Sequence, residues 1–190
     1  MTKTKNKFDL SIFIFISITY IAAYSMTSGF FSPLQKILAP NLPSNISLMF
    51  IPHGVRVISF YFYGRWAYIY LAPASLLMWA LEVYGDKNIN FLPTGILISL
   101  IACHLGVTLS TTMLRAYKHS NSTPFNWKEL LIAGTFGSII NSVGLTAIYD
   151  GRYSVFSFFG YLFGDITGQF FLMLIGMMFF RLVRTLNKLP

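Results

Sequence analysis

The sequence predicts an all-α integral membrane protein: a bundle of about six transmembrane helices with both termini in the cytoplasm. Composition is the first observation behind this prediction. Of the 190 residues, 55% are hydrophobic and only 11% are charged, whereas soluble domains carry about 25% charged residues. A soluble domain of this size cannot remove so much apolar surface from water. Lipid is therefore the expected solvent for much of the chain.

Long apolar runs are the second observation. A helix needs about 20 apolar residues to cross a bilayer, and the runs here are continuously apolar, unlike the alternating strands of a membrane barrel. The first run follows a basic start and lacks a clear cleavage site, so we expect a retained helix, followed by a loop with Pro33, Pro40 and Pro43. The predicted spans of this single transmembrane domain, 1–190, are 8–27, 46–63, 66–84, 91–116, 127–149 and 153–183.

The distribution of basic residues is the third observation. With a cytoplasmic N-terminus, ten basic residues fall on the inner side: Lys3, Lys5, Lys7, Arg65, Arg115, Lys118, Lys128, Arg181, Arg184 and Lys188. Only three, Lys36, Lys87 and Arg152, fall on the outer side, and Arg56 remains inside the membrane. Cytoplasmic loops carry the excess of Lys and Arg, so the sequence predicts a multi-pass membrane protein with both ends inside the cell.

Several classes of function are disfavoured. The net charge of +8 does not indicate nucleic-acid binding, because the basic residues lie between apolar runs rather than on one water-facing surface. The single cysteine, Cys103, excludes an internal disulfide and a cysteine metal cluster. There is no H-E-x-x-H motif and no phosphate-binding glycine loop. We therefore expect no enzyme, no metal and no cofactor.

Polar residues recur at one depth of the predicted bundle. An ionisable side chain in the bilayer core is costly, so it normally faces protein or water. Counting about 1.5 Å per helical residue, five polar side chains from four spans fall within roughly 10 Å of one level, with Gln169 slightly deeper. These six residues form the predicted ligand site or polar midplane layer: His53, Arg56, His104, Asn141, Asp165 and Gln169.

Arg56 and Asp165 are the expected ion pair of this layer. Arginine is always charged, and Asp165 is the acidic residue at a comparable depth. His53 precedes Arg56 by three residues and should border the same site. The pair has two interpretations, which the sequence leaves open. It serves helix packing, with His53 and Asn141 as hydrogen-bonding groups, or it forms the polar floor of a ligand pocket.

Glycines are expected to bring helices close together around the polar layer. Gly160, Gly164 and Gly168 are spaced four apart on the last span, and such ridges allow close approach of membrane helices.

Two segments carry a resemblance to a known family. The stretch IPHGVRVISFYFYGRWAYIYLAPASLL, residues 51–77, and the stretch FFGYLFGDITGQFFLMLIGMMFF, residues 158–180, resemble helices of bacterial MASE1 membrane sensor domains. The resemblance implies a location in a bacterial inner membrane. It also implies a packing role for Gly54, Gly164 and Gly168 and a turn at Gly64 and Arg65. Members of that family usually contain more spans and precede a kinase or cyclase output domain. The resemblance therefore implies a stand-alone sensory or ligand-binding module that signals through a separate protein partner.

Three alternatives remain. Size and span count also resemble the substrate-capture subunits of energy-coupling-factor vitamin transporters, which work with a separate transporter module. A structural membrane subunit is the second alternative. A haem protein with His53 and His104 as axial ligands is the third and the least favoured, because two histidines are the smallest possible set. The transporter hypothesis and the sensory hypothesis both imply a small-molecule ligand, whose identity the sequence leaves open.

Overall fold

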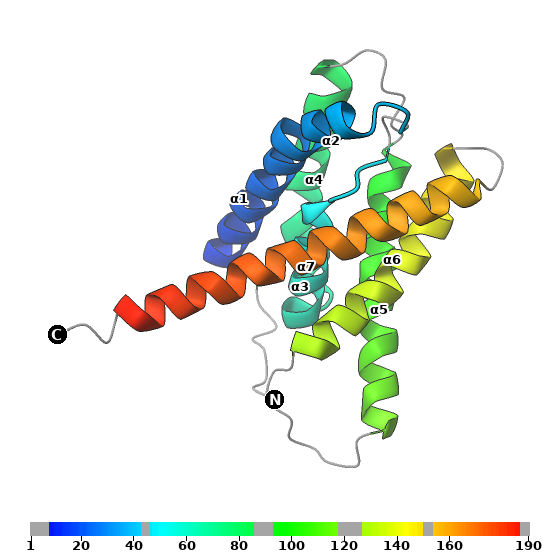
Figure 1. Ribbon diagram of the computed structural model, residues 1–190. Helices are drawn as coiled ribbons and strands as arrows, with labels where there is room; N and C mark the ends of the chain where they lie inside the picture. The colour runs from blue at the N-terminus through cyan, green and yellow to red at the C-terminus, as the bar shows by residue number, and fades with distance from the viewer. Residues whose placement is uncertain (1–7, 43–45, 86–92, 118–126, 150–153, 187–190) are drawn as a thin grey trace.

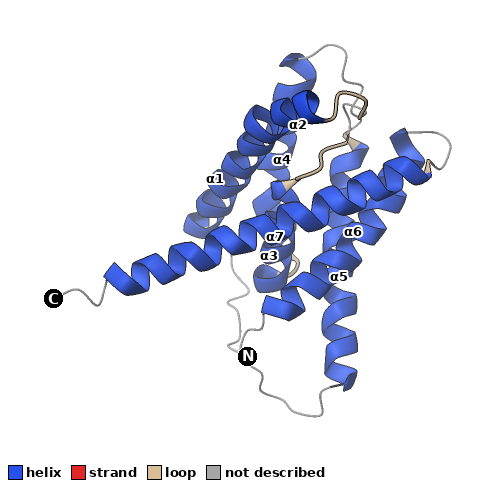
Figure 2. Cartoon of the chain, viewed as in Figure 1, coloured by secondary structure: helices blue, strands red, loops and turns tan. Residues whose placement is uncertain are grey.

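The structure is a computed structural model that describes residues 8–42, 46–85, 93–117, 127–149 and 154–186. Within those ranges all regular secondary structure is helical (Figure 2). The elements in chain order are α1 (Leu10–Met26), the π-helical turn η1 (Thr27–Phe31), α2 (Ser32–Leu38), α3 (Ile51–Tyr63), α4 (Trp66–Gly85), α5 (Thr94–Tyr117), α6 (Trp127–Tyr149) and α7 (Val155–Leu186).

In the described part of the chain, five helical segments are long and apolar enough to cross a membrane. They are Leu10–Leu38, Trp66–Tyr84, Thr94–Leu114, Trp127–Tyr149 and Val155–Leu186. The prediction of a multi-pass helical membrane bundle is thus confirmed, and the predicted spans 66–84 and 127–149 match these segments closely. The predicted starts at residues 91 and 153 lie outside the described residues. The last helix continues to Leu186, three residues beyond the predicted end.

The first helix is longer than predicted. Asp9 begins it, since its side chain accepts hydrogen bonds from the backbone nitrogens of Ser11 and Ile12. Instead of ending near Thr27, the helix continues through η1 into α2. Pro33 was expected in a loop but lies in the first turn of α2. A proline removes one backbone hydrogen bond and crowds the preceding turn, and the wider π-helical turn ahead of it accommodates the ring.

The predicted helical span 46–63 is wrong in its first part. Residues 46–50 are not helical, and α3 begins only at Ile51, with Pro52 in its first turn. Proline is compatible with a helix start because the first backbone N–H groups have no partner within the helix. At 13 residues, α3 is too short to cross a bilayer by itself. Figure 1 shows the non-helical stretch leading from α2 into the bundle, where α3 starts.

Polar groups of neighbouring helices satisfy the backbone of the non-helical stretch 46–50. The Gln35 side chain donates to the Ile46 carbonyl at 2.7 Å and accepts from the Leu48 nitrogen at 2.7 Å. On the other side, Thr167 Oγ1 donates to the Leu48 carbonyl, and the Phe50 nitrogen donates to the Gly164 carbonyl at 2.8 Å. Non-helical backbone is tolerated at membrane depth only where protein satisfies it in this way.

The ridge of glycines on α7 faces that stretch. A Cβ atom added at Gly164 would overlap the carbonyl oxygen of Ser47, and one added at Gly168 would overlap the backbone of Phe50. At Gly160 the neighbour is the side chain of Ile46. Because these glycines have no side chains, the non-helical stretch 46–50 packs directly against α7. We had expected a neighbouring helix at this position. Gly54 does make a helix–helix approach, since an added Cβ would lie 3.0 Å from Gln169 Cα.

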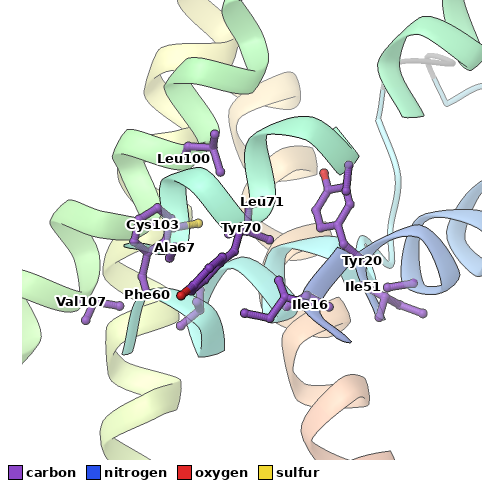
Figure 3. Close-up of a cluster of buried hydrophobic side chains, with 14 of the residues drawn as sticks. Ile16, Tyr20, Ile51, Phe60, Ala67, Tyr70, Leu71, Leu100, Cys103 and Val107 are labelled. Atoms are coloured by element: carbon purple, nitrogen blue, oxygen red, sulfur yellow. The ribbon is translucent and has the colours of Figure 1, made fainter. Parts of the chain in front are cut away.

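The bundle is built around the α5–α6 pair, with α7 lying diagonally across α3 and α6 (Figure 1). A Cβ added at Gly106 of α5 would overlap the backbone of Gly137 on α6, which shows how closely these two helices approach. Gly64, with φ 52°, makes the turn between α3 and α4. The buried apolar cluster joins α1, α3, α4 and α5 and includes Tyr20, Ile51, Phe60, Leu71 and Leu100 (Figure 3).

Candidate functional site

A chain of hydrogen-bonded side chains crosses the interior of the bundle. Asp165 of α7 contacts His53 of α3, with Oδ2 3.3 Å from Nδ1. The same oxygen accepts a hydrogen bond from Asn141 Nδ2 of α6 at 2.7 Å. Ser99 of α5 donates to Asn141 Oδ1 at 2.9 Å. All four side chains are buried, so polar contacts join four helices in the interior of the bundle.

The His53 ring has polar neighbours on both sides. Nε2 lies 3.3 Å from the carbonyl oxygen of Gly134 and 3.1 Å from Ser138 Oγ of α6. On the other side, Nδ1 lies 3.3 Å from the Asp165 carboxyl group of α7 and 3.7 Å from Cys103 Sγ of α5. The ring therefore joins α3 to three other helices.

Arg56 has a different set of neighbours. Its Nη2 donates to the Tyr20 hydroxyl of α1 at 2.6 Å. The guanidinium carbon lies 5.4 Å from the ring centroids of both Tyr20 and Phe50, which is within the range of cation–π attraction. The side chain is buried, and Nε has no hydrogen-bond partner. The guanidinium group has five N–H donors, and among the described residues Tyr20 accepts the one hydrogen bond that it makes.

The expected Arg56–Asp165 ion pair is therefore not formed. Within the described part of the chain, the ion pair of Asp165 is with His53. Three positions along a helix differ by about 60° in direction and about 4.5 Å in height. His53 thus points toward α6 and α7 while Arg56 points toward α1. A tyrosine hydroxyl from the first helix occupies the place that we assigned to the carboxylate.

Arg56 and Asp165 nevertheless line the same cavity. Its volume is about 150 Å³. Asn141 and Ser99 form the polar floor with Arg56 and Asp165. Aromatic side chains form much of the wall, namely Tyr20, Tyr24, Phe50, Trp79, Tyr149 and Tyr161. The floor thus presents a guanidinium group with unused donors, and the walls present apolar and aromatic surface.

The cavity extends from this floor toward one end of the bundle. Its outer lining includes Glu82 near the end of α4, Gly95 at the start of α5 and Tyr149 at the end of α6. Ser32 at the start of α2 lies on the same side. The Glu82 carboxylate accepts a hydrogen bond from Tyr24. The opposite end of the bundle holds the turn at Gly64 and the start of α6 at Trp127.

Two predicted site residues lie apart from the cavity. Nδ1 of His104 and the Tyr68 hydroxyl form a hydrogen bond at 2.9 Å. The His104 ring stacks on the Phe60 ring, with 5.3 Å between the two ring centroids. Gln169 donates to the Leu130 carbonyl at 2.8 Å and packs against Gly134. His53 touches the floor of the cavity only through Asp165. Among the described residues, no group of three His, Cys, Asp or Glu side chains could hold a metal ion, and His53 and His104 each have protein partners of their own.

Several residues of the site escaped the sequence analysis. Tyr20 and Tyr24 of α1, with Thr27 and Ser28 of η1, form one wall of the cavity. Their spacing of three to four residues places them on one helical face, and this polar stripe was the signal that could have found them. Thr27 Oγ1 also accepts a hydrogen bond from the Ile51 nitrogen, so it helps to hold the start of α3. Gln35 gave no comparable signal, because its partners are backbone groups.

The comparisons with known proteins add no relative. No protein-family description, curated protein or solved structure matches this chain. The functional argument therefore rests on the geometry of the site.

Proposed function

We propose that this chain forms a membrane module that binds a small molecule in the cavity between α1, α3, α4, α5, α6 and α7. The observation that carries the proposal is the floor of that cavity. Arg56 is 4% exposed, lines the cavity and has an Nε without a partner. A buried charge with unused donors is strongly unfavourable unless something pairs with it, and a bound molecule would supply the missing partner.

The proposed topology places the mouth of the cavity outside the cell. Of the described basic residues, Arg65, Arg115, Lys128, Arg181 and Arg184 belong to helix ends or turns opposite the mouth, whereas Lys36 lies on the mouth side. The positive-inside rule then supports cytoplasmic termini. The stretch 46–50 and α3 together would make the sixth crossing.

Sensing is the function that we favour, in line with the resemblance to MASE1 domains. Ligand binding at the floor would contact side chains of α1, α3, α6 and α7, and a difference in affinity between two arrangements of these helices would shift their populations. The cytoplasmic ends of α5 and α7 would pass that change to a separate output protein.

Substrate capture for a transporter is the second candidate. A cavity with its mouth on the proposed outer side is what a capture subunit needs. The two functions differ in their partner. Affinity purification of the tagged chain from native membranes should recover a kinase or cyclase if the chain is a sensor. It should recover an ATPase module if the chain is a transporter subunit. Recovery of neither class from native membranes would leave a structural subunit as the better description.

Retention of small molecules tests the ligand-binding proposal directly. The chain would be purified in lipid nanodiscs from cells, and bound metabolites would be identified by native mass spectrometry. Ile96 lines the cavity, whereas Leu97 on the same helix is 61% exposed on the bundle surface. Ile96→Trp should expel the bound molecule, and Leu97→Trp should retain it. Equal spectra for wild type and Ile96→Trp would overturn the proposal.

A further inference from the structure

We infer that the ligand is a small organic monocarboxylate with an apolar or aromatic body, and that its carboxylate binds Arg56. This inference rests on the proposed function, because it names the chemical class of the molecule that the cavity would take. Charge, hydrogen-bond geometry and the shape of the walls carry it in turn.

Charge is the first step. Arginine is permanently cationic in proteins. Within the described residues, Arg56 makes no ion pair, since the Asp165 carboxyl group is in contact with His53 and Asn141 instead. Glu82, the other acid of the cavity lining, accepts a hydrogen bond from Tyr24 nearer the mouth. The guanidinium group therefore has no directly bound anion, which a carboxylate on a ligand would supply.

Hydrogen-bond geometry is the second step. The guanidinium is a planar fork that binds a carboxylate through two parallel N–H···O bonds. Within the described part of the chain, the Tyr20 hydroxyl is the one group that accepts a hydrogen bond from Arg56, and it does so from Nη2. Nε of Arg56 has no hydrogen-bond partner there. The first backbone N–H groups of α3 offer no competing anion site. Ile51 N is bound by Thr27, Pro52 has none, and His53 N donates to the Phe50 carbonyl.

The walls are the third step. The rings of Tyr20 and Phe50 flank the guanidinium at 5.4 Å each, and Trp79, Tyr149 and Tyr161 continue the aromatic lining. Thr27, Ser28, Ser47 and Ser75 add hydroxyl groups to this lining. Its aromatic part stabilises an apolar body. The volume of about 150 Å³ equals that of an engineered protein cavity that binds benzene, so a benzene-sized carboxylate fits these dimensions.

Benzoate is the probe that tests this inference. Binding to the full chain in nanodiscs would be measured by isothermal titration calorimetry, with two comparison molecules. Benzyl alcohol has the same body without the charge, and acetate has the charge without the body. We expect benzoate to bind at least about 10-fold more tightly than either, because a charge-assisted pair contributes about 1.5–3 kcal/mol. Equal affinity for benzyl alcohol would show that Arg56 does not select the ligand, and equal affinity for acetate would show a simple anion site. Either result, or no benzoate binding, overturns the inference.

Three variants separate ligand recognition from folding. Arg56→Met keeps the length of the side chain and removes its charge, and Arg65→Met makes the same change at an exposed turn outside the cavity. Arg56→Met should weaken benzoate binding by about 100-fold while melting at the same temperature or higher, because it removes a buried charge. Arg65→Met should bind like wild type. Should Arg56→Met fail to fold, Arg56→Lys retains the charge without the planar fork and should bind about 10-fold more weakly. Unchanged binding by the Arg56 variant that folds would overturn the assignment.

The outcome is distinguishable from failure of the proposed function. If native mass spectrometry finds a bound metabolite that Ile96→Trp expels, but that metabolite is uncharged and benzoate does not bind, the cavity is a ligand site of another class. If no metabolite and none of the three probes binds, the ligand-binding function itself is wrong.

Discussion

His53 and Asp165 make the buried ionic contact of the bundle, with Nδ1 of the histidine 3.3 Å from Oδ2 of the aspartate. Arg56, one helical turn further along α3, instead reaches the Tyr20 hydroxyl of α1. The two basic side chains of α3 therefore separate into different roles. His53 joins α3 to α7, and Arg56 faces the cavity with most of its donors unused.

Paired mutations should show this separation in stability. Double-mutant cycles with His53→Phe, Arg56→Met and Asp165→Leu would be measured by SDS-titrated unfolding in mixed micelles. We expect a coupling free energy of about 1–3 kcal/mol between His53 and Asp165, because the two side chains are in direct contact. The coupling between Arg56 and Asp165 should be smaller. A larger Arg56–Asp165 value would contradict the contacts described above.

The glycines of α7 should differ in their tolerance to alanine. Gly164→Ala should lower stability by about 2 kcal/mol or more, because the new Cβ overlaps the backbone carbonyl of Ser47. Gly160→Ala should cost less, since its neighbour is the flexible Ile46 side chain. Gly176 of the same helix has nothing within 4 Å of an added Cβ, so Gly176→Ala is the matched control. Melting temperatures in detergent rank the three variants, and equal values for Gly164→Ala and Gly176→Ala would refute the close packing of residues 46–50.

Gln35 should be important for the crossing that contains α3. Gln35→Leu leaves the Ile46 carbonyl and the Leu48 nitrogen without their partner, and each buried unsatisfied group costs about 1–3 kcal/mol. We expect faster proteolysis or hydrogen exchange in residues 46–50, measured by mass spectrometry. Lys36→Leu, one residue away on the exposed side of α2, should leave the exchange unchanged. Protection that is identical in both variants would rule out this role for Gln35.

His104 should be dispensable for ligand binding. It lies outside the cavity, stacked on Phe60 and hydrogen-bonded to Tyr68. His104→Phe keeps the stacking and removes one hydrogen bond, so the loss of stability should be about 1 kcal/mol. Benzoate titration should give the wild-type affinity, whereas Asp165→Leu, at the floor of the cavity, should change it. A loss of affinity in His104→Phe would place His104 in the site after all.

Composition and residue counting predicted the helical membrane fold class and grouped several of the buried polar residues. Apolar runs of spanning length require helices in lipid, because every backbone polar group must be satisfied within the segment. Counting residues along those helices brought His53, Arg56, Asn141 and Asp165 to one level, and the structure places Arg56, Asn141 and Asp165 around one cavity, with His53 behind Asp165. These inferences depend on helix rise and on solvent alone.

Only the tertiary structure decided which of these groups touch. Depth gives height along the bundle but not direction around each helix, so it could not show that His53 faces α7 while Arg56 faces Tyr20 of α1. Nor could a local pattern predict that residues 46–50 are non-helical. That stretch is stabilised by Gln35, eleven or more residues earlier, and by Gly164 and Thr167, more than a hundred residues later. Contacts between such distant positions depend on how the helices pack, which no single segment encodes.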